Sequence, residues 1–359
     1  MNKILLIGPL SPPINGVSIC NDKITSLKEI GFQVAHINTA NVNFSEQLGV
    51  FSIKKTMVIL KQYVYLYKIF GGNTIYITPG QTFFGVLKYL PFLLLSKILN
   101  KKIVLHIHGN YLKSEYENLQ GLQKKIFKFT IKLASSGIVL SPSLKNNLTP
   151  FLKENDIYIV PNFVDEEIFN IQEKEIENKG FKTLKILFLS NLMTEKGILD
   201  LLDSLEILEN KKVIYEAILA GNIDPEIKEV VLNKINSLNN TTYLGVVRGK
   251  QKKEILLNAN VFVFPTYYKM EGQPISLLEA MGFGNIILTT NHAGISDIIT
   301  KANGFFVKKK SPKDIADHLT MLSTTLSQYK NMSLNNHKYV KTQFSEKKFL
   351  SSLKKILAN

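Results

Sequence analysis

Short apolar runs alternate with amphipathic segments along the first half of the chain. The apolar runs predict buried strands at residues 4–7, 32–37, 74–78, 103–108, 137–140 and 157–160. Between them, apolar residues recur at helical spacing, as in Val17, Cys20, Ile24 and Leu27 before a stop at Gly31. Helices are expected there and at 53–70, 83–99, 119–134 and 143–154.

The pattern restarts after residues 170–183, a polar stretch expected to be an interdomain linker. Strands are expected at 185–189, 213–219, 242–244, 261–264, 286–288 and 304–307. Ser311 and Pro312 are expected as the N-cap and first turn of a late helix. An early helix carries one apolar face, made of Ile198, Leu201, Leu202, Leu205 and Leu208. This alternation predicts an α/β protein with two doubly wound parallel sheets.

Length and cysteine content fit this picture. The 359 residues suit two domains. The single cysteine, Cys20, allows no intrachain disulfide, which favours a reducing, cytoplasmic location. Cys20 falls on an apolar helix face, so we expect a core residue rather than a nucleophile. The first apolar run is too short for a signal peptide, and residues 69–87 contain too many glycines for a membrane span.

The positive charge is concentrated in the N-terminal half. The chain has net charge +15, and residues 1–160 hold 18 lysines against 7 acidic residues. Nucleic acid and an anionic membrane surface are candidate partners, and an ordinary solvated surface is the alternative. The chain lacks the usual nucleic-acid-binding modules and has one arginine, Arg248, so we expect no nucleic acid.

Two segments of this half suggest peripheral docking on the inner face of the plasma membrane. Residues 54–68 combine lysines with Tyr63, Tyr65 and Tyr67, and residues 90–95 are apolar. Such segments bind anionic lipid surfaces, which would bring the protein near a lipid-linked acceptor. The alternative is that both segments are core helices.

Two candidate sites follow strands of the first half. The loop of residues 8–16 ends at Gly16, where backbone N–H groups at a helix start could face a phosphate or a sugar; the alternative is a rigid proline-rich turn. This loop lacks the G-x-G-x-x-G of a dehydrogenase. His106 and His108 share one face at a strand's carboxyl end, where ligands collect. No third metal ligand is evident, so we favour His108 as a polar contact to the sugar of a donor, with a structural histidine as the alternative, above all for His106.

Two more sites lie in the second half. Lys196, expected in the first turn of a helix, could hold a diphosphate together with the helix dipole, or it could be an ordinary exposed lysine. Pro274 is expected in the first turn of another helix, with Glu271 in the preceding loop and Glu279 inside it. These carboxylates could bind hydroxyl groups of one extended ligand. They could also be merely solvated, but Glu279 lies in an apolar segment and there needs a partner.

Together these residues resemble the family 4 glycosyltransferases, retaining enzymes of the GT-B fold. The strongest part is residues 264–294, with its E-x7-E pattern at Glu271 and Glu279. Residues 160–165 resemble the family's P-N-G-V-D hinge, with Phe163 in place of Gly. Residues 12–17 resemble its glycine loop, with Asn15 where a second Gly is common, and residues 344–357 resemble its closing helix.

The resemblance implies two Rossmann-like domains facing across a cleft. Residues 1–165 would form the acceptor-side domain, with a C-terminal helix at about 340–359 packing back onto it. Residues 166–339 would bind the nucleotide-sugar donor. Glu279 would bind the ribose, Glu271 hydroxyls of the transferred sugar, and Lys196 the diphosphate. The donor site would also include the backbone of Gly272, Gln273, Pro274, Ile275 and Ser276.

The resemblance further places His108 and Gly16 beside the reaction centre. Asn191 stands where many members carry an arginine. The implied function is retaining transfer of a hexose or N-acetylhexosamine from a nucleotide-diphosphate sugar, UDP favoured over GDP, to a hydroxyl of a glycan or lipid-linked saccharide. No metal or cofactor is expected. The alternatives are a nucleotide-sugar epimerase of similar fold and a non-catalytic basic membrane-binding protein.

Overall fold

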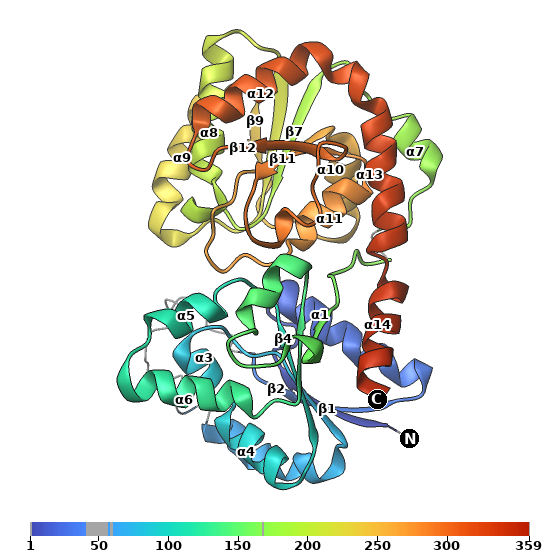
Figure 1. Ribbon diagram of the computed structural model, residues 1–359. Helices are drawn as coiled ribbons and strands as arrows, with labels where there is room; N and C mark the ends of the chain where they lie inside the picture. Colours follow the sequence, from blue (N-terminus) through green and yellow to red (C-terminus); the bar gives the residue numbers. More distant parts are fainter. Residues whose placement is uncertain (1, 41–56, 58–59, 167–168, 359) are drawn as a thin grey trace. The chain divides into compact units, whose positions relative to one another are not determined.

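The chain forms two compact units. The computed structural model describes residues 2–40, 57, 60–166 and 169–358. The N-terminal unit comprises Met1–Asn162 and Lys347–Asn359, and the C-terminal unit comprises Phe163–Glu346 (Figure 1). The last helix, α14 (Glu346–Ala358), therefore lies almost wholly in the N-terminal unit.

The N-terminal unit is built on a six-stranded parallel sheet of order β2-β1-β3-β4-β5-β6. Its strands are β1 (Lys3–Gly8), β2 (Gln33–Asn38), β3 (Thr74–Ile77), β4 (Lys102–Ile107), β5 (Ser136–Val139) and β6 (Ile157–Ile159). In the described ranges its helices before α14 include α1 (Gly16–Thr25), η1 (Ser26–Ile30), η2 (Val64–Gly71), α3 (Phe83–Leu87), α4 (Leu90–Ile98), α5 (Leu112–Asn118), α6 (Gly121–Lys132), η3 (Pro142–Asn147) and η4 (Glu154–Asp156).

The C-terminal unit repeats this architecture with the strand order β12-β11-β10-β7-β8-β9. The strands are β7 (Leu184–Leu189), β8 (Tyr215–Ala220), β9 (Thr241–Tyr243), β10 (Val261–Phe264), β11 (Ile286–Thr290) and β12 (Gly304–Val307). The helices are α7 (Glu173–Glu177), η5 (Thr194–Lys196), α8 (Ile198–Asn210), η6 (Pro225–Ile227), α9 (Lys228–Ser237), α10 (Gly249–Asn258), α11 (Ile275–Gly282), η7 (Ala293–Ile295), α12 (Pro312–Thr325), η8 (Leu326–Tyr329) and α13 (Lys330–Gln343).

The expected strands are confirmed because their sequences suit burial on both faces. Every residue of β3, β5, β10 and β11 is buried, as parallel strands covered by helices require. The expected cap of α12 is also confirmed, since the Ser311 side chain accepts a hydrogen bond from the Asp314 N–H. The core role of Cys20 is confirmed as well: it is fully buried, its Sγ lies 3.2 Å from Asn162 Oδ1, and burial raises its pKa.

Two helix predictions are wrong. The segment 83–99 is not one helix but two, α3 and α4, with Pro91 near the start of α4. The segment 143–154 forms the short 3-10 helices η3 and η4 instead of an α-helix. Pro150 cannot continue a helix, and the Asn147 side chain donates to the Leu144 carbonyl, which competes with helical bonding. Most of the expected helix 53–70 before η2 lies outside the described residues.

The expected linker 170–183 is also wrong. It contains α7, and its apolar side chains Ile171, Ile176 and Phe181 are buried in the core of the C-terminal unit. Lys179 is buried too, and its ammonium donates to the carbonyl oxygens of Leu256 and Phe283. The Glu/Lys cluster of this segment gives it a polar composition, although its spaced apolar residues pack into the core.

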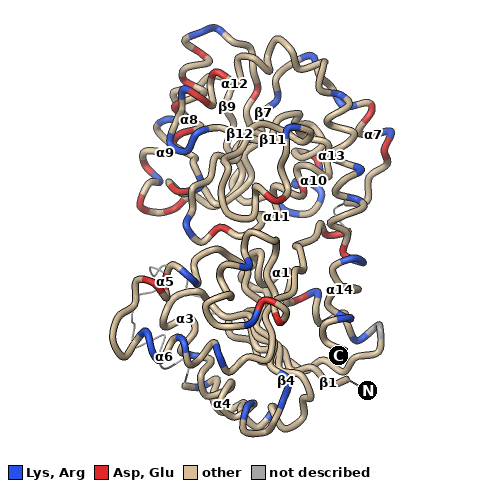
Figure 2. The backbone as a smooth tube through the Cα atoms, viewed as in Figure 1, with Lys and Arg blue, Asp and Glu red and all other residues tan. Residues whose placement is uncertain are grey.

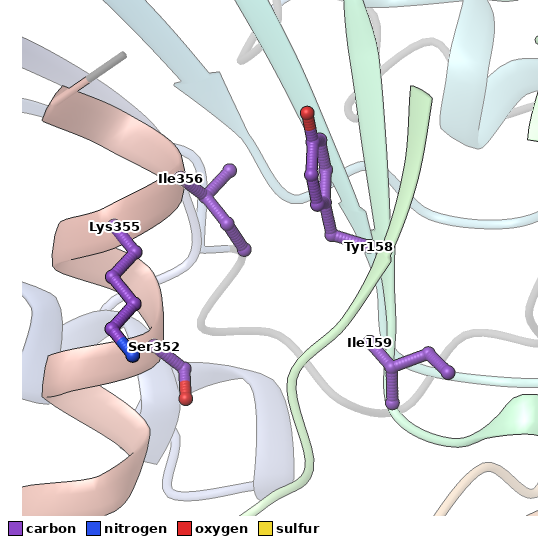
Figure 3. Close-up of a pocket in the computed structure, with 5 residues that line it drawn as sticks. All are labelled: Tyr158, Ile159, Ser352, Lys355 and Ile356. Carbon is purple, nitrogen blue, oxygen red and sulfur yellow. The ribbon is translucent and has the colours of Figure 1, made fainter. Parts of the chain in front are cut away.

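A pocket of about 290 Å³ opens between β6 and α14 of the N-terminal unit. Figure 3 shows its lining residues, Tyr158, Ile159, Ser352, Lys355 and Ile356. None of them is a residue that the sequence analysis singled out. The pocket lies beside an edge strand, with Tyr158 and Ile159 about two-fifths exposed, at 41% and 37%.

Candidate functional site

The strand order of the C-terminal sheet fixes where a ligand can enter. The chain runs from β7 outward to β8 and β9, then returns to β10 on the other side of β7. Ligands of open α/β sheets bind beyond the carboxyl ends of the strands at such a reversal. The loop after β7 carries Lys196, and the loop after β10 carries Glu271. The topology therefore brings these two predicted residues to one edge of the sheet.

Lys196 and Glu271 form a buried ion pair. The Lys196 ammonium donates to Glu271 Oε2 at 2.6 Å, and the two side chains are only 14% and 8% exposed. Thr266 donates its hydroxyl to the same carboxylate oxygen at 3.2 Å. The ammonium also lies over the ring of Tyr268, 4.8 Å from its centroid. Such a lysine is held in place, which excludes the reading of Lys196 as an ordinary exposed residue.

The backbone around Lys196 differs from the prediction. Lys196 ends the 3-10 helix η5, and α8 begins two residues later, so it does not lie in the first helical turn. Between them, Gly197 takes the left-handed conformation at φ 80°, and a Cβ there would lie 2.6 Å from the Pro265 oxygen. A lysine ahead of a helix N-terminus adds to the positive end of the dipole, which favours an anion.

The segment after Glu271 leads into α11. Pro274 is the N-cap rather than a first-turn residue, and no side chain caps this helix among the described residues. Gly272, Gln273 and Pro274 are buried, whereas Ile275 and Ser276 are partly exposed. The first-turn N–H groups of a helix have no intrahelical partner, so this helix start suits an anionic or hydroxyl-rich ligand.

Glu279 lies inside α11 and has the partner that its burial demands. It is 2% exposed, and its Oε1 accepts from the Lys252 ammonium of α10 at 2.6 Å. Its Oε2 is buried and has no hydrogen-bond partner in the described part of the chain. Burial raises the pKa of Glu279, while the charge and the hydrogen bond of Lys252 oppose that rise. The reading of Glu279 as a solvated carboxylate is therefore wrong.

Sequence reasoning missed several residues of this region. Lys252 stands among other lysines in residues 250–253, and nothing in that run marks it. His292, after β11, donates its Nε2 proton to the Tyr268 carbonyl at 2.8 Å and accepts at Nδ1 from Lys309 at 2.9 Å. This chain of bonds ties the loop after β11 to the loop that carries Glu271.

Asn191, which the sequence analysis singled out, is exposed and adds no charge at a position where the resembled family often has an arginine.

In the glycine loop of the N-terminal unit, a side chain of the loop accepts hydrogen bonds from the backbone N–H groups at the helix start. Asn15 caps α1, and its Oδ1 accepts from the N–H groups of Val17 and Ser18 at 3.0 Å each. Those two donors are therefore already satisfied and do not face a ligand, contrary to the expectation. Gly16 is the first helical residue of α1, as expected, but its helical backbone does not need the left-handed angles of glycine.

His106 and His108 lie side by side at the end of β4, with ring centroids 4.0 Å apart. His106 Nδ1 is hydrogen-bonded to the Tyr76 hydroxyl, which fits a structural histidine. His108 is partly exposed as a residue, but both of its ring nitrogens are buried without a partner among the residues that the structure describes. Burial lowers the pKa of His108 to about 3, so its imidazole is neutral and suits hydrogen bonding to a hydroxyl.

The described residues contain neither a membrane-spanning helix nor a cluster of metal ligands. None of their helices is long and apolar enough to cross a membrane. Their His, Cys, Asp and Glu side chains form no group of three or more that could hold a metal ion.

Related sequences point to one enzyme class. The family described as glycosyl transferases group 1 matches residues 169–339. An uncharacterized glycosyltransferase of Methanocaldococcus jannaschii is 26% identical over 321 residues, covering 86% of this chain and 79% of the relative. The capsular polysaccharide biosynthesis glycosyltransferase CapM of Staphylococcus aureus is 28% identical over 244 residues, covering 62% of this chain and 60% of CapM.

A third relative, of Campylobacter jejuni, is named N,N'-diacetylbacillosaminyl-diphospho-undecaprenol alpha-1,3-N-acetylgalactosaminyltransferase. It is 27% identical over 215 residues, covering 55% of this chain and 53% of the relative. The chain thus matches less than two thirds of the length of this enzyme and of CapM. The named relatives favour a transferase over the epimerase and over the non-catalytic binding protein.

The fold agrees with this class. The structure of HepE of Anabaena in complex with UDP-glucose superposes with a TM-score of 0.75 at 15% identity, covering 99% of each chain. Such a likeness shows the fold, and it confirms the GT-B fold that the sequence predicts. Residues 169–339 match the family described as glycosyl transferases group 1, and the named relatives are glycosyltransferases, so the chain is a glycosyltransferase.

Proposed function

We propose that the enzyme transfers a hexose or N-acetylhexosamine from a nucleotide-diphosphate sugar, UDP favoured over GDP, to a hydroxyl of a glycan or lipid-linked saccharide. The buried Lys196–Glu271 pair at the sheet edge carries this proposal. The fold neighbour HepE binds UDP-glucose, and the names of two relatives refer to capsular polysaccharide and to a diphospho-undecaprenol acceptor. These observations support a donor with a diphosphate and a saccharide acceptor.

Each candidate residue has a role that suits its environment. Lys196, beside the start of α8, binds the diphosphate, and Glu271 binds hydroxyls of the transferred sugar. Glu279 offers its unpartnered Oε2 to the ribose. The backbone from Gly272 to Ser276 meets the sugar and the phosphates. His108 gives a neutral polar contact to the sugar beside the reaction centre, where we also propose the loop that ends at Gly16.

The chemistry is substitution at the anomeric carbon with retained configuration. The bond from that carbon to the β-phosphate oxygen breaks, and its electron pair leaves with the nucleoside diphosphate. The acceptor hydroxyl oxygen bonds to the oxocarbenium-like carbon from the same face, and its proton passes to the departing phosphate oxygen. Stabilising the departing charge is an electrostatic task, for which Lys196 and the helix starts are suited. We propose that no metal takes part.

A surface of the N-terminal unit supports peripheral membrane docking. Exposed apolar side chains of η2 and the end of α4 are Val64, Tyr67, Phe70 and Ile98, at 72%, 62%, 63% and 73%. Residues 47–114 contain no acidic residue, and Figure 2 shows basic positions at α4. An apolar surface with lysines suits an anionic lipid layer. The run 90–95 contributes less, because Phe92 and Leu93 are buried in the core.

Three measurements test the proposal. A thermal-shift screen with UDP-, GDP- and ADP-sugars identifies the donor. A ligand at about 100 times its Kd adds about 2.7 kcal/mol to the free energy of unfolding, which raises the melting temperature. NMR of the product reports its anomeric configuration, and an inverted product refutes retention. Donor isomerised without any acceptor would instead indicate the epimerase. Co-sedimentation with vesicles that does not depend on anionic lipid would contradict the docking surface.

A further inference from the structure

The pair formed by Lys252 and Glu279 differs from the other cross-helix ion pairs described in the C-terminal unit. Lys252 and Glu279 have side chains 18% and 3% exposed. Lys234–Asp203 and Lys338–Glu173 also join two helices, but their side chains are 34–51% exposed. Exposed pairs add little to stability, while a buried pair pays a desolvation penalty that its attraction barely offsets. A buried pair is thus weak evidence for a stabilising role and leaves room for another.

The geometry of the pair leaves one oxygen of Glu279 for a ligand. Lys252 holds Oε1 at 2.6 Å, and the second oxygen, Oε2, is buried with no partner within the described ranges. A buried carboxylate oxygen without a donor is costly unless something supplies one. A hydroxyl group of a bound ligand is such a donor. Because Lys252 fixes one oxygen, the direction of the other is fixed as well.

The charge of Lys252 also favours the ionised form of Glu279, which is the better hydrogen-bond acceptor. Burial raises the pKa of Glu279, and Asp165 adds to that rise, while Lys252 lowers it by its charge and its hydrogen bond. Among the described residues, Lys252 and Asp165 are the charged groups that shift the pKa of Glu279. Removing Lys252 would leave burial and Asp165 unopposed, so Glu279 would take up a proton more easily. A protonated carboxyl makes weaker hydrogen bonds to hydroxyls than a carboxylate does.

We propose that Lys252 is a positioning residue for the donor: it orients Glu279 so that Oε2 accepts a hydroxyl of the ribose. Lys252 acts through the carboxylate and does not itself bind the phosphates. This inference rests on the proposed role of Glu279 in donor binding, and no comparison assigns a role to Lys252.

The test measures the binding of UDP and of uridine, which has the ribose without the phosphates, to the full chain. The variants are K252M, K252R, E279Q and K252M/E279Q, with K234M as a control that breaks an exposed pair. We expect K252M to weaken UDP and uridine by the same factor, about tenfold (1.4 kcal/mol) or more. K252R should stay within about threefold of the wild type, because it keeps the charge and the donor. K234M should bind as the wild type does.

Two further readouts separate positioning from a merely structural role. Adding K252M to E279Q should cause no further loss, because Lys252 acts only through Glu279. The ratio of Kd values for K252M and wild type should fall as the pH rises, since the carboxyl of Glu279, whose pKa burial raises, regains its charge at higher pH. The ionisation of the phosphates cancels in this ratio. If K252M does not fold, K252Q takes its place. We expect K252Q to lose the same affinity for UDP and uridine.

The outcomes are distinct. UDP binding by K252M equal to that of the wild type overturns the inference. The inference is also overturned if K252M binds UDP more weakly than the wild type but binds uridine equally well, because Lys252 would then bind the phosphates directly. If E279Q itself binds UDP as tightly as the wild type, the proposed role of Glu279 fails, and the inference fails with it. If E279Q loses affinity and K252M does not, only the role of Lys252 fails. If the wild type prefers GDP, GDP and guanosine replace the two probes.

Discussion

The candidate residues of the two units differ in charge and in hydrogen-bond pairing. In the C-terminal unit the residues are charged and already paired, Lys196 with Glu271 and Lys252 with Glu279. In the N-terminal unit His108 is neutral, and its buried ring nitrogens have no partner among the described residues. Charged groups beside a helix start suit a charged ligand, the diphosphate donor. A neutral imidazole suits a hydroxyl. The difference teaches that donor affinity should depend on the C-terminal unit, whereas His108 of the N-terminal unit should affect turnover with little effect on donor affinity.

The largest effect should come from Lys196→Ala. The change removes the charge proposed to stabilise the leaving diphosphate and leaves the buried Glu271 carboxylate with the Thr266 hydroxyl as its side-chain hydrogen-bond donor among the described residues. We expect kcat/KM to fall about 100- to 1000-fold, or about 2.7–4 kcal/mol. Lys211→Ala, which breaks an exposed pair, is the control. Steady-state kinetics with the donor from the screen would reveal the effect, and a loss below about tenfold would contradict the assignment.

Glu279→Ala should have the next largest effect, on donor affinity. The change removes the oxygen proposed to accept from the ribose and leaves Lys252 without its carboxylate. Calorimetry should show donor binding at least about tenfold weaker, or about 1.4 kcal/mol. Unchanged affinity in a folded variant would remove Glu279 from the site.

His108→Ala should lower kcat by about tenfold while the donor Kd stays within about twofold, because the lost contact is a neutral hydrogen bond near the reacting sugar. Burial lowers the pKa of His108 to about 3, so the imidazole is already unprotonated well below neutral pH. The ratio of wild-type to variant kcat should therefore be flat from about pH 5 to about pH 8. A ratio that changes with a midpoint near the ordinary histidine pKa of about 6.5 would contradict a neutral contact.

Asn191→Arg should have the smallest effect, in the opposite direction. It restores a positive charge at the exposed position where the resembled family often has arginine. We expect donor binding to tighten by about two- to fivefold, because an exposed charge pair contributes only about 0.2–1 kcal/mol. Calorimetry at low and high salt would measure the gain, which should shrink as salt increases. Weaker binding at both salt concentrations would show that the position does not face the phosphates.

Much of the fold could be predicted because parallel strands are continuous apolar runs. The strands β7 and β10 and the apolar face of α8 follow directly from such patterns. Segments that combine charged residues with buried apolar residues are not predicted by such patterns. Residues 170–183 looked like a linker because of their Glu/Lys cluster, although Ile176 and Phe181 are core residues. Local patterns do not report which charged residues the fold will bury.

The candidate site was predictable where one loop or one helix carried the signal. The burial of Glu279 followed from its apolar neighbours, and the need for a partner followed from its burial. The identity of that partner, Lys252, did not follow, because the two residues lie on different helices and meet only in the fold. The Asn15 cap that satisfies Val17 and Ser18 was likewise overlooked in favour of an open anion site.

The most direct test of the division between the units is donor binding measured by calorimetry on four proteins: wild type, Lys196→Ala, Glu279→Ala and His108→Ala. The ligand is the nucleotide sugar that gives the largest thermal shift. We predict that the two variants of the C-terminal unit bind it at least about tenfold more weakly, while His108→Ala binds it within about twofold of the wild type. Equal affinity in all four proteins, or a loss confined to His108→Ala, would contradict the account.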